Sequence, residues 1–152
     1  MADTALLIID MQNDFVSEGG ALKIEGASSV IPGVLKVLDA FRKAGAPIFH
    51  VVRVHRADGS DVEIIRKEKF AKTPFAVEGT WGSAIVDELK PRQGEYVVRK
   101  IRMSSFLDTD LDLMLKSLGI KTLVIAGVQT PNCIRTTVFD AIAYNYRAIV
   151  VE

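Results

Sequence analysis

Three side chains carry groups that could act together in nucleophilic chemistry: Asp10, Lys100 and Cys133. A thiol becomes a nucleophile when it loses its proton, a carboxylate can accept that proton, and an ammonium group favours the ionised thiol. Asp10 follows the apolar run 5–9, Lys100 ends the run 96–100, and Cys133 comes shortly after the run 122–126. If these runs are parallel strands, the three groups share the carboxyl edge of one sheet, where ligand sites form.

Each of these residues also has a purely structural explanation when it is taken alone. Asp10 could hydrogen-bond the loop that follows it, and Lys100 could be a solvated strand end. Cys133 could be a small buried residue, because free cysteine often behaves as a core residue. Only the coincidence of the three at one edge favours a reactive site.

The segment before Cys133 predicts where its thiol lies. Thr130 is a suitable N-cap residue, and Pro131 then takes the first helical position, which proline favours. Cys133 falls in the first turn, where the positive end of the helix dipole stabilises a thiolate. We therefore expect a thiol pKa below the usual value of about 8.5.

Apolar runs alternate with segments of helical spacing along the whole chain. Strands are predicted at 5–9, 47–54, 96–100, 122–126 and 148–151. Helices are predicted at 29–43, 83–89, 109–118 and 131–144, and the charged run 66–69 is typical of a solvated helix face. The glycine-containing segment 11–26 is predicted to be a loop. The alternation predicts an α/β fold with three α/β/α layers and a mainly parallel, Rossmann-type open sheet.

Composition limits the classes of function. The chain has 152 residues, of which 49% are hydrophobic and 25% are charged, and 19 basic residues balance 19 acidic ones. These values predict one globular domain over 1–152 and argue against a generic binder of nucleic acid or acidic membranes. The N-terminal apolar run is too short for a signal or membrane helix, which predicts a cytoplasmic protein.

The sequence predicts no metal or cofactor. Cys133 is the single cysteine, which excludes an intramolecular disulfide and a cysteine-based zinc site. His50 and His55 lie on a predicted strand and at its exit, and they cannot build a zinc site by themselves. The glycines of 11–26 do not match a dinucleotide fingerprint or a phosphate loop.

Three segments carry a resemblance to the isochorismatase-like cysteine hydrolase superfamily, in its amidohydrolase branch. They are LIIDMQNDF at 7–15, Lys100 with the residues at 105–111, and GVQTPNC at 127–133. The resemblance implies an Asp–Lys–Cys catalytic triad made by Asp10, Lys100 and Cys133. It also implies a cis peptide between Val128 and Gln129, and an oxyanion hole formed by the backbone N–H groups of Gln129 and Cys133.

Differences from parts of that superfamily narrow the expected reaction. The chain lacks the Asp-x-His…His metal site of nicotinamidases, and it keeps a cysteine on which isochorismatases do not depend. The stretch 75–82 resembles ureido- and carbamoyl-amide hydrolases. These features predict a metal-independent cysteine hydrolase that cleaves the C–N bond of a small linear amide or ureide through a thioester.

The resemblance also implies a homo-oligomer, and it bears on the extent of the domain. Superfamily members usually continue beyond a fifth strand with a helix and another strand, which the domain 1–152 is expected to lack.

Aromatic Phe15 and Trp81 are candidates for binding the substrate. Arg53, Arg56 and Arg102 are unranked candidates for a substrate carboxylate. Three alternative functions remain open: an isochorismatase-type ether hydrolase, a non-catalytic interaction protein that retains the fold, and a thiol sensor built around Cys133. A sensor usually needs a second thiol to resolve it, which this chain could obtain only from a partner.

Overall fold

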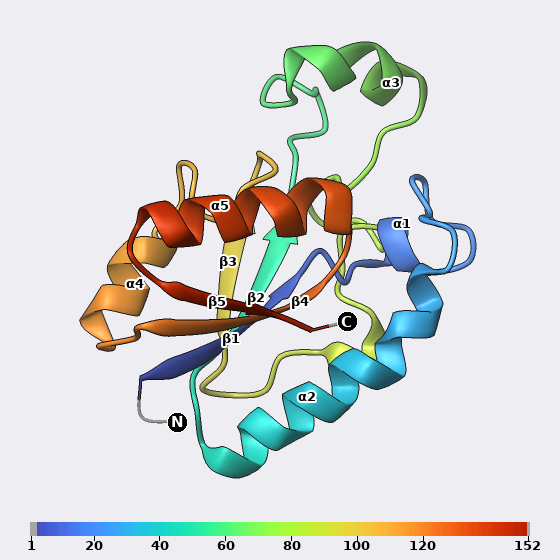
Figure 1. The fold of residues 1–152 in the computed structure, drawn as a ribbon. Coiled ribbons are helices and arrows are strands. Elements are labelled where there is room, and N and C mark those ends of the chain that lie inside the picture. The colour runs from blue at the N-terminus through green and yellow to red at the C-terminus, as the bar shows by residue number, and fades with distance from the viewer. Residues whose placement is uncertain (1–2, 152) are drawn as a thin grey trace.

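The computed structural model describes residues 3–151, whose strands form a single parallel sheet (Figure 1). The strands are β1 (Thr4–Ile9), β2 (Ile48–Arg53), β3 (Tyr96–Lys100), β4 (Thr122–Gly127) and β5 (Arg147–Val150). Their order across the sheet is β3-β2-β1-β4-β5, and every neighbouring pair is parallel. The predicted parallel sheet is therefore confirmed, with β1 at its centre.

The central strand is apolar on both faces because helices cover both faces of the sheet. Leu6 and Ile8 of β1 belong to one buried cluster, and Leu7 and Ile9 belong to the other. A strand with helices on both sides is a continuous apolar run, which is the pattern that 5–9 shows in the sequence.

The helices form the two outer layers (Figure 1). The short helix α1 (Asn13–Val16) and α2 (Ile31–Ala44) lie on one side, with α4 (Leu111–Ser117) and α5 (Arg135–Ala143) on the other. Helix α3 (Lys67–Lys72) belongs to a segment that projects beyond the end of β2. The three-layer α/β/α prediction is confirmed.

Three local predictions differ from the structure. The helix predicted at 83–89 is wrong: only Asp87–Leu89 forms a 3₁₀ turn, because Ile85 pairs with Gln12 in an antiparallel bridge. The loop predicted at 11–26 contains α1. The helix predicted at 131–144 begins with a π-helical turn, Thr130–Ile134, and the Thr130 side chain does not cap it.

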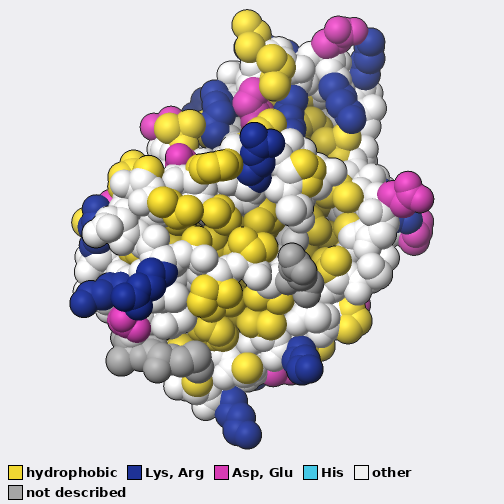
Figure 2. Space-filling model, in the orientation of Figure 1, with side chains coloured by type: hydrophobic (Ala, Val, Ile, Leu, Met, Phe, Trp, Pro, Cys, Tyr) yellow, Lys and Arg dark blue, Asp and Glu magenta, His cyan; other side chains and the backbone are white. Residues whose placement is uncertain are grey.

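An extended apolar region lies on the surface at the β5 edge of the sheet. Figure 2 shows hydrophobic side chains gathered on this face, and Ile149 and Val150 of β5 are 54% and 42% exposed. No helix within residues 3–151 has the length and apolar content needed to cross a bilayer.

Gly127 allows the ends of β1 and β4 to approach each other closely, which brings the residues after these strands together. Its φ is 118°, and a Cβ at this position would lie 2.2 Å from the carbonyl oxygen of Ile9. We expect Gly127→Ala to lower the free energy of unfolding by about 2 kcal/mol or more, through backbone strain and overpacking.

Urea denaturation measures this loss, and Gly33→Ala is the matched control. Gly33 lies in α2 with nothing within 4 Å of an added Cβ, so alanine there is expected to be neutral or slightly stabilising. Equal stability of the two variants would contradict the close approach at Gly127.

Candidate active site

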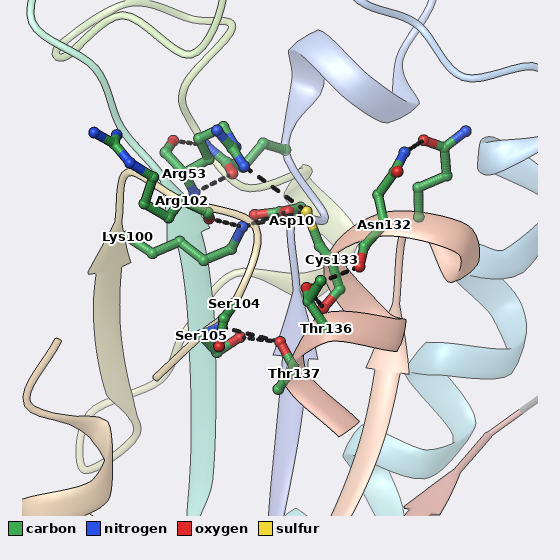
Figure 3. Close-up of polar contacts among 12 residues, drawn as sticks. Asp10, Arg53, Lys100, Arg102, Ser104, Ser105, Asn132, Cys133, Thr136 and Thr137 are labelled. Atoms are coloured by element: carbon green, nitrogen blue, oxygen red, sulfur yellow. Dashed lines mark hydrogen bonds and ion pairs between the residues drawn. The ribbon is translucent and has the colours of Figure 1, made fainter. Parts of the chain in front are cut away.

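The carboxyl ends of four adjacent strands each supply one side chain to a common site. Asp10 follows β1, Arg53 ends β2, Lys100 ends β3, and Cys133 follows β4 after a short loop. All four residues are buried, with exposed fractions between 1% and 6%. Figure 3 shows Asp10, Arg53 and Lys100 converging on the sulfur of Cys133.

Asp10 is held by its backbone at the point where β1 ends. Its N–H donates to the carbonyl of Val51, its carbonyl accepts from the N–H of Gln12, and its φ is 54°. Left-handed backbone is uncommon outside glycine and concentrates at functional sites. The side-chain oxygen Oδ1 is buried and has no hydrogen-bond partner among residues 3–151. That oxygen is thus available to accept a proton.

Lys100 links the carboxylate to the sulfur. Its Nζ lies 3.0 Å from Oδ2 of Asp10 and 3.4 Å from Sγ of Cys133, and it donates to the carbonyl of Arg102 at 2.9 Å. An ammonium group has three N–H donors, so it can interact with all three of these partners at the same time. The structure therefore brings Asp10, Lys100 and Cys133 together, as the sequence predicted.

The thiol of Cys133 experiences opposing influences. Burial raises its pKa, and the negative charge of Asp10 raises it further, while Lys100 and Arg53 lower it. The net direction is upward, so the thiol is protonated at neutral pH. The expected low pKa is therefore wrong for the free protein, because burial and the adjacent Asp10 carboxylate both disfavour the thiolate.

Two side chains of the 7–15 segment bind backbone groups of the segments that surround the site. The Gln12 side chain accepts from the Arg53 N–H at 2.8 Å and donates to the Arg53 carbonyl at 2.7 Å. The Asp14 carboxylate accepts from the N–H groups of Ala21 and Ala76. Because the bonds to Arg53 and Ala76 join segments far apart in sequence, the motif positions the walls around the site.

A cavity of about 740 Å³ opens onto three of the four side chains, those of Asp10, Arg53 and Cys133. Asp10, Arg53, Cys133 and Phe15 line it, but Lys100 lies behind them. The remaining lining residues come from the segments around it: Gly20, Ala21, Leu22, Lys23, Ile24, Glu25, Arg66, Lys69, Thr73, Phe75, Val128, Gln129 and Asn132.

The aromatic wall of the cavity differs from the prediction. Phe15 lines it as expected, with its ring centroid 6.5 Å from that of Phe75. Trp81 does not line it: the residue is 58% exposed, and its carbonyl accepts from the Asn13 side chain and from the Ala84 N–H. Phe75, and not Trp81, is therefore the second aromatic residue of the cavity wall.

The three candidate arginines have different positions. Arg53 is buried in the cavity wall, whereas Arg56 is exposed and outside it. Arg102 donates to the carbonyls of Asp61 and Ile101 and does not line the cavity.

The loop between β4 and α5 forms the wall beside the sulfur. The peptide bond between Val128 and Gln129 is cis, and both residues line the cavity. The Asn132 side-chain amide donates to Oε1 of Gln129 at 2.6 Å, which fixes the loop next to Cys133. Among residues 3–151, no group of three or more His, Cys, Asp or Glu is placed to hold a metal ion.

The chain is similar in sequence to known proteins. A family model described as the isochorismatase domain matches residues 4–152. A probable inactive nicotinamidase of Arabidopsis thaliana is 43% identical over an alignment of 152 positions that covers 98% of this chain and 78% of the relative. The ureidoacrylate amidohydrolase RutB of Agrobacterium fabrum is 31% identical over 170 residues, covering 99% of this chain and 75% of the relative.

The fold has a solved counterpart. The crystal structure of an isochorismatase family protein from Desulfovibrio vulgaris superposes with a TM-score of 0.95 at 45% identity. The match covers 99% of this chain and 80% of that protein.

Proposed function

Because the chain belongs to the isochorismatase family, we propose that it is a cysteine hydrolase that cleaves the C–N bond of an amide or ureide through a thioester. The observation that carries this proposal is the contact of Lys100 Nζ with both Asp10 and the sulfur of Cys133. A proton acceptor, a cation and a nucleophile at these distances are the parts that acyl transfer needs.

The first half-reaction forms the thioester. Asp10 accepts the thiol proton as the sulfur attacks the carbonyl carbon, so a C–S bond forms and the carbonyl oxygen becomes negative. The backbone N–H groups of Gln129 and Cys133 receive this oxyanion, and one such donor is typically worth about 3 kcal/mol. The C–N bond then breaks, and the leaving nitrogen takes the proton from Asp10.

The second half-reaction restores the thiol. Asp10 accepts a proton from water as the water oxygen attacks the thioester carbon. The C–S bond breaks, the acid product leaves, and the proton passes from Asp10 to the sulfur. Lys100 keeps the Asp10 carboxylate oriented in both halves, because it contacts the carboxylate and the sulfur together.

The cavity supports a substrate that carries a carboxylate. Lys23, Arg53, Arg66 and Lys69 line it, against the acidic side chains of Asp10 and Glu25. Carboxylates form strong charge-assisted hydrogen bonds with such cations. The Agrobacterium fabrum relative is named for ureidoacrylate, whose acrylate part is a carboxylate.

Ammonia release from matched compounds tests the proposal. We expect N-carbamoylglycine to be hydrolysed with a kcat/KM about tenfold or more above that of its uncharged methyl ester, since a charged hydrogen bond is worth about 1.5–3 kcal/mol. Nicotinamide is expected to release no ammonia.

The outcomes also separate the alternatives. A relative named as a probable inactive nicotinamidase makes a non-catalytic protein the second candidate. Folded protein that releases ammonia from no member of a wider panel of linear amides and ureides would favour that candidate. Equal kcat/KM values for the acid and the ester would contradict the preference for a substrate carboxylate, but they would leave the proposed hydrolysis intact.

A further inference from the structure

Arg53 is the charged group at the nucleophile that the Asp–Lys–Cys triad does not include. Its Nη2 lies 3.9 Å from Sγ of Cys133, and the side chain is 1% exposed. A guanidinium group is costly to bury unless its other donors are satisfied. Its position against the sulfur is therefore one that the surroundings must hold in place.

The surrounding residues hold the guanidinium through Nη1, whereas the sulfur contact is made by Nη2. Nη1 donates to Oε1 of Glu63 at 2.7 Å and lies 3.5 Å from the Ile101 carbonyl and 3.4 Å from Nε2 of His55. Gln12 clamps the Arg53 backbone from both its N–H and its carbonyl. Nη1 is thus committed to structural partners, and Nη2 is the end directed at the reacting atom.

We infer that Arg53 is a fourth catalytic residue, a permanent cation that stabilises the sulfur of Cys133 when Asp10 takes its proton. This inference rests on the proposed function.

Negative charge moves between two residues in that step. The S–H bond breaks, the proton goes to Asp10, and the electron pair stays on sulfur, so one negative charge moves from the carboxylate to Cys133. Lys100 contacts both ends of this movement, at 3.0 Å and 3.4 Å, and therefore favours them similarly. Within residues 3–151, the carboxylate paired with Arg53 is Glu63, while Asp10 pairs with Lys100. Nη2 of Arg53 contacts the sulfur directly, and the charge of Asp10 also acts on Arg53, so Arg53 stabilises the thiolate by contact without hydrogen-bonding the carboxylate.

The charge of Arg53 is present throughout the working pH range. Burial lowers its pKa, but the negative charges of Asp10, Glu63 and Cys133 together raise it above its ordinary value. The groups that face the sulfur are Asp10 from β1, Arg53 from β2 and Lys100 from β3. The groups that face Arg53 from the 55–63 segment are His55 and Glu63, and burial and Arg53 itself lower the pKa of His55.

The test is the pH dependence of Cys133 alkylation by iodoacetamide, which needs no substrate. Arg53→Met is expected to move the alkylation midpoint upward by about one pH unit or more, because a cation close to the sulfur is lost. Arg53→Lys keeps the charge and is expected to move it less. Arg56→Met is the matched control, since Arg56 is exposed and outside the cavity, and its midpoint is expected to stay unchanged.

Glu63→Gln gives a shift of opposite sign. The amide still accepts a hydrogen bond from Arg53, but the anion that shares the guanidinium charge is removed, so the midpoint is expected to move downward. A purely structural role of the Arg53–Glu63 pair would not give opposite shifts. If Arg53→Met does not fold, Arg53→Lys and Glu63→Gln carry the test.

Each result bears on the inference directly. An unchanged midpoint in folded Arg53→Met, or an upward shift in Glu63→Gln, overturns it. Because alkylation is independent of turnover, the opposite shifts support the effect of Arg53 on the thiol even if no amide is hydrolysed. Hydrolysis without these shifts would overturn the role of Arg53 and leave the proposed reaction intact.

Discussion

Replacement of Cys133 by serine is expected to reduce amide turnover by about 10⁴-fold or more, because the attacking atom of the proposed reaction is lost. A serine hydroxyl is far less acidic than a thiol, and a carboxylate is a weak base for it. The substitution is nearly isosteric, so the buried contacts of residue 133 change little. Ammonia release measures turnover, and mass spectrometry of quenched native protein is expected to detect an acyl adduct on Cys133.

Thr136→Ser provides the matched control for that variant. Thr136 lies one helical turn from Cys133, and its hydroxyl donates to the Asn132 carbonyl, a bond that serine can keep. Its turnover is expected to stay within about twofold, since the change lies outside the cavity. Ammonia release by Cys133→Ser within tenfold of the native rate would contradict covalent catalysis by the thiol.

The sheet and its reactive edge could be predicted from the sequence because local patterns determine them. The run 96–100 was assigned to the residues that form β3, and the run 5–9 differs from β1 by one residue. Parallel strands place their carboxyl ends at one edge, so residues at strand ends could be grouped without knowledge of tertiary contacts. That rule is sufficient to bring Asp10, Lys100 and Cys133 to one site.

The same rule could have identified Arg53, which sequence reasoning left unranked among three arginines. The predicted strand 47–54 extended past Arg53, whereas β2 ends at that residue. In addition, Arg53 pairs with Glu63, which lies in the segment between β2 and α3. The sequence of that segment has no strong helical or strand periodicity from which its position could be predicted. A one-residue error in a strand boundary was therefore enough to hide a buried cation.

Other features depended on contacts between distant segments. The bridge of Gln12 with Ile85 replaces the predicted helix at 83–89, and no local pattern records that partner. The direction of the Cys133 pKa shift depends on burial and on Asp10, which lies 123 positions away in the chain. Helix position alone could not predict the balance of these effects.

Replacement of Asp10 by asparagine is expected to change turnover and thiol reactivity in opposite directions. Turnover should fall by about 10²–10⁴-fold, because the amide cannot accept the thiol proton. Alkylation of Cys133 at neutral pH should become faster, because the Asp10 charge raises the thiol pKa and asparagine removes it. Asparagine also tolerates the left-handed backbone at this position, where φ is 54°.

The two measurements together distinguish a lost base from a damaged site. Iodoacetamide labelling and ammonia release are followed on the same folded preparation, and Asp14→Asn serves as the control carboxylate. Asp14 binds the Ala21 and Ala76 N–H groups, and the asparagine side-chain oxygen can keep one of those bonds. Any loss of turnover in Asp14→Asn should come from less rigid cavity walls, and the pH midpoint of Cys133 alkylation should stay unchanged. If turnover and alkylation of Asp10→Asn fell together, Asp10 would act as a scaffold, and the proton transfer at the centre of the proposed reaction would be contradicted.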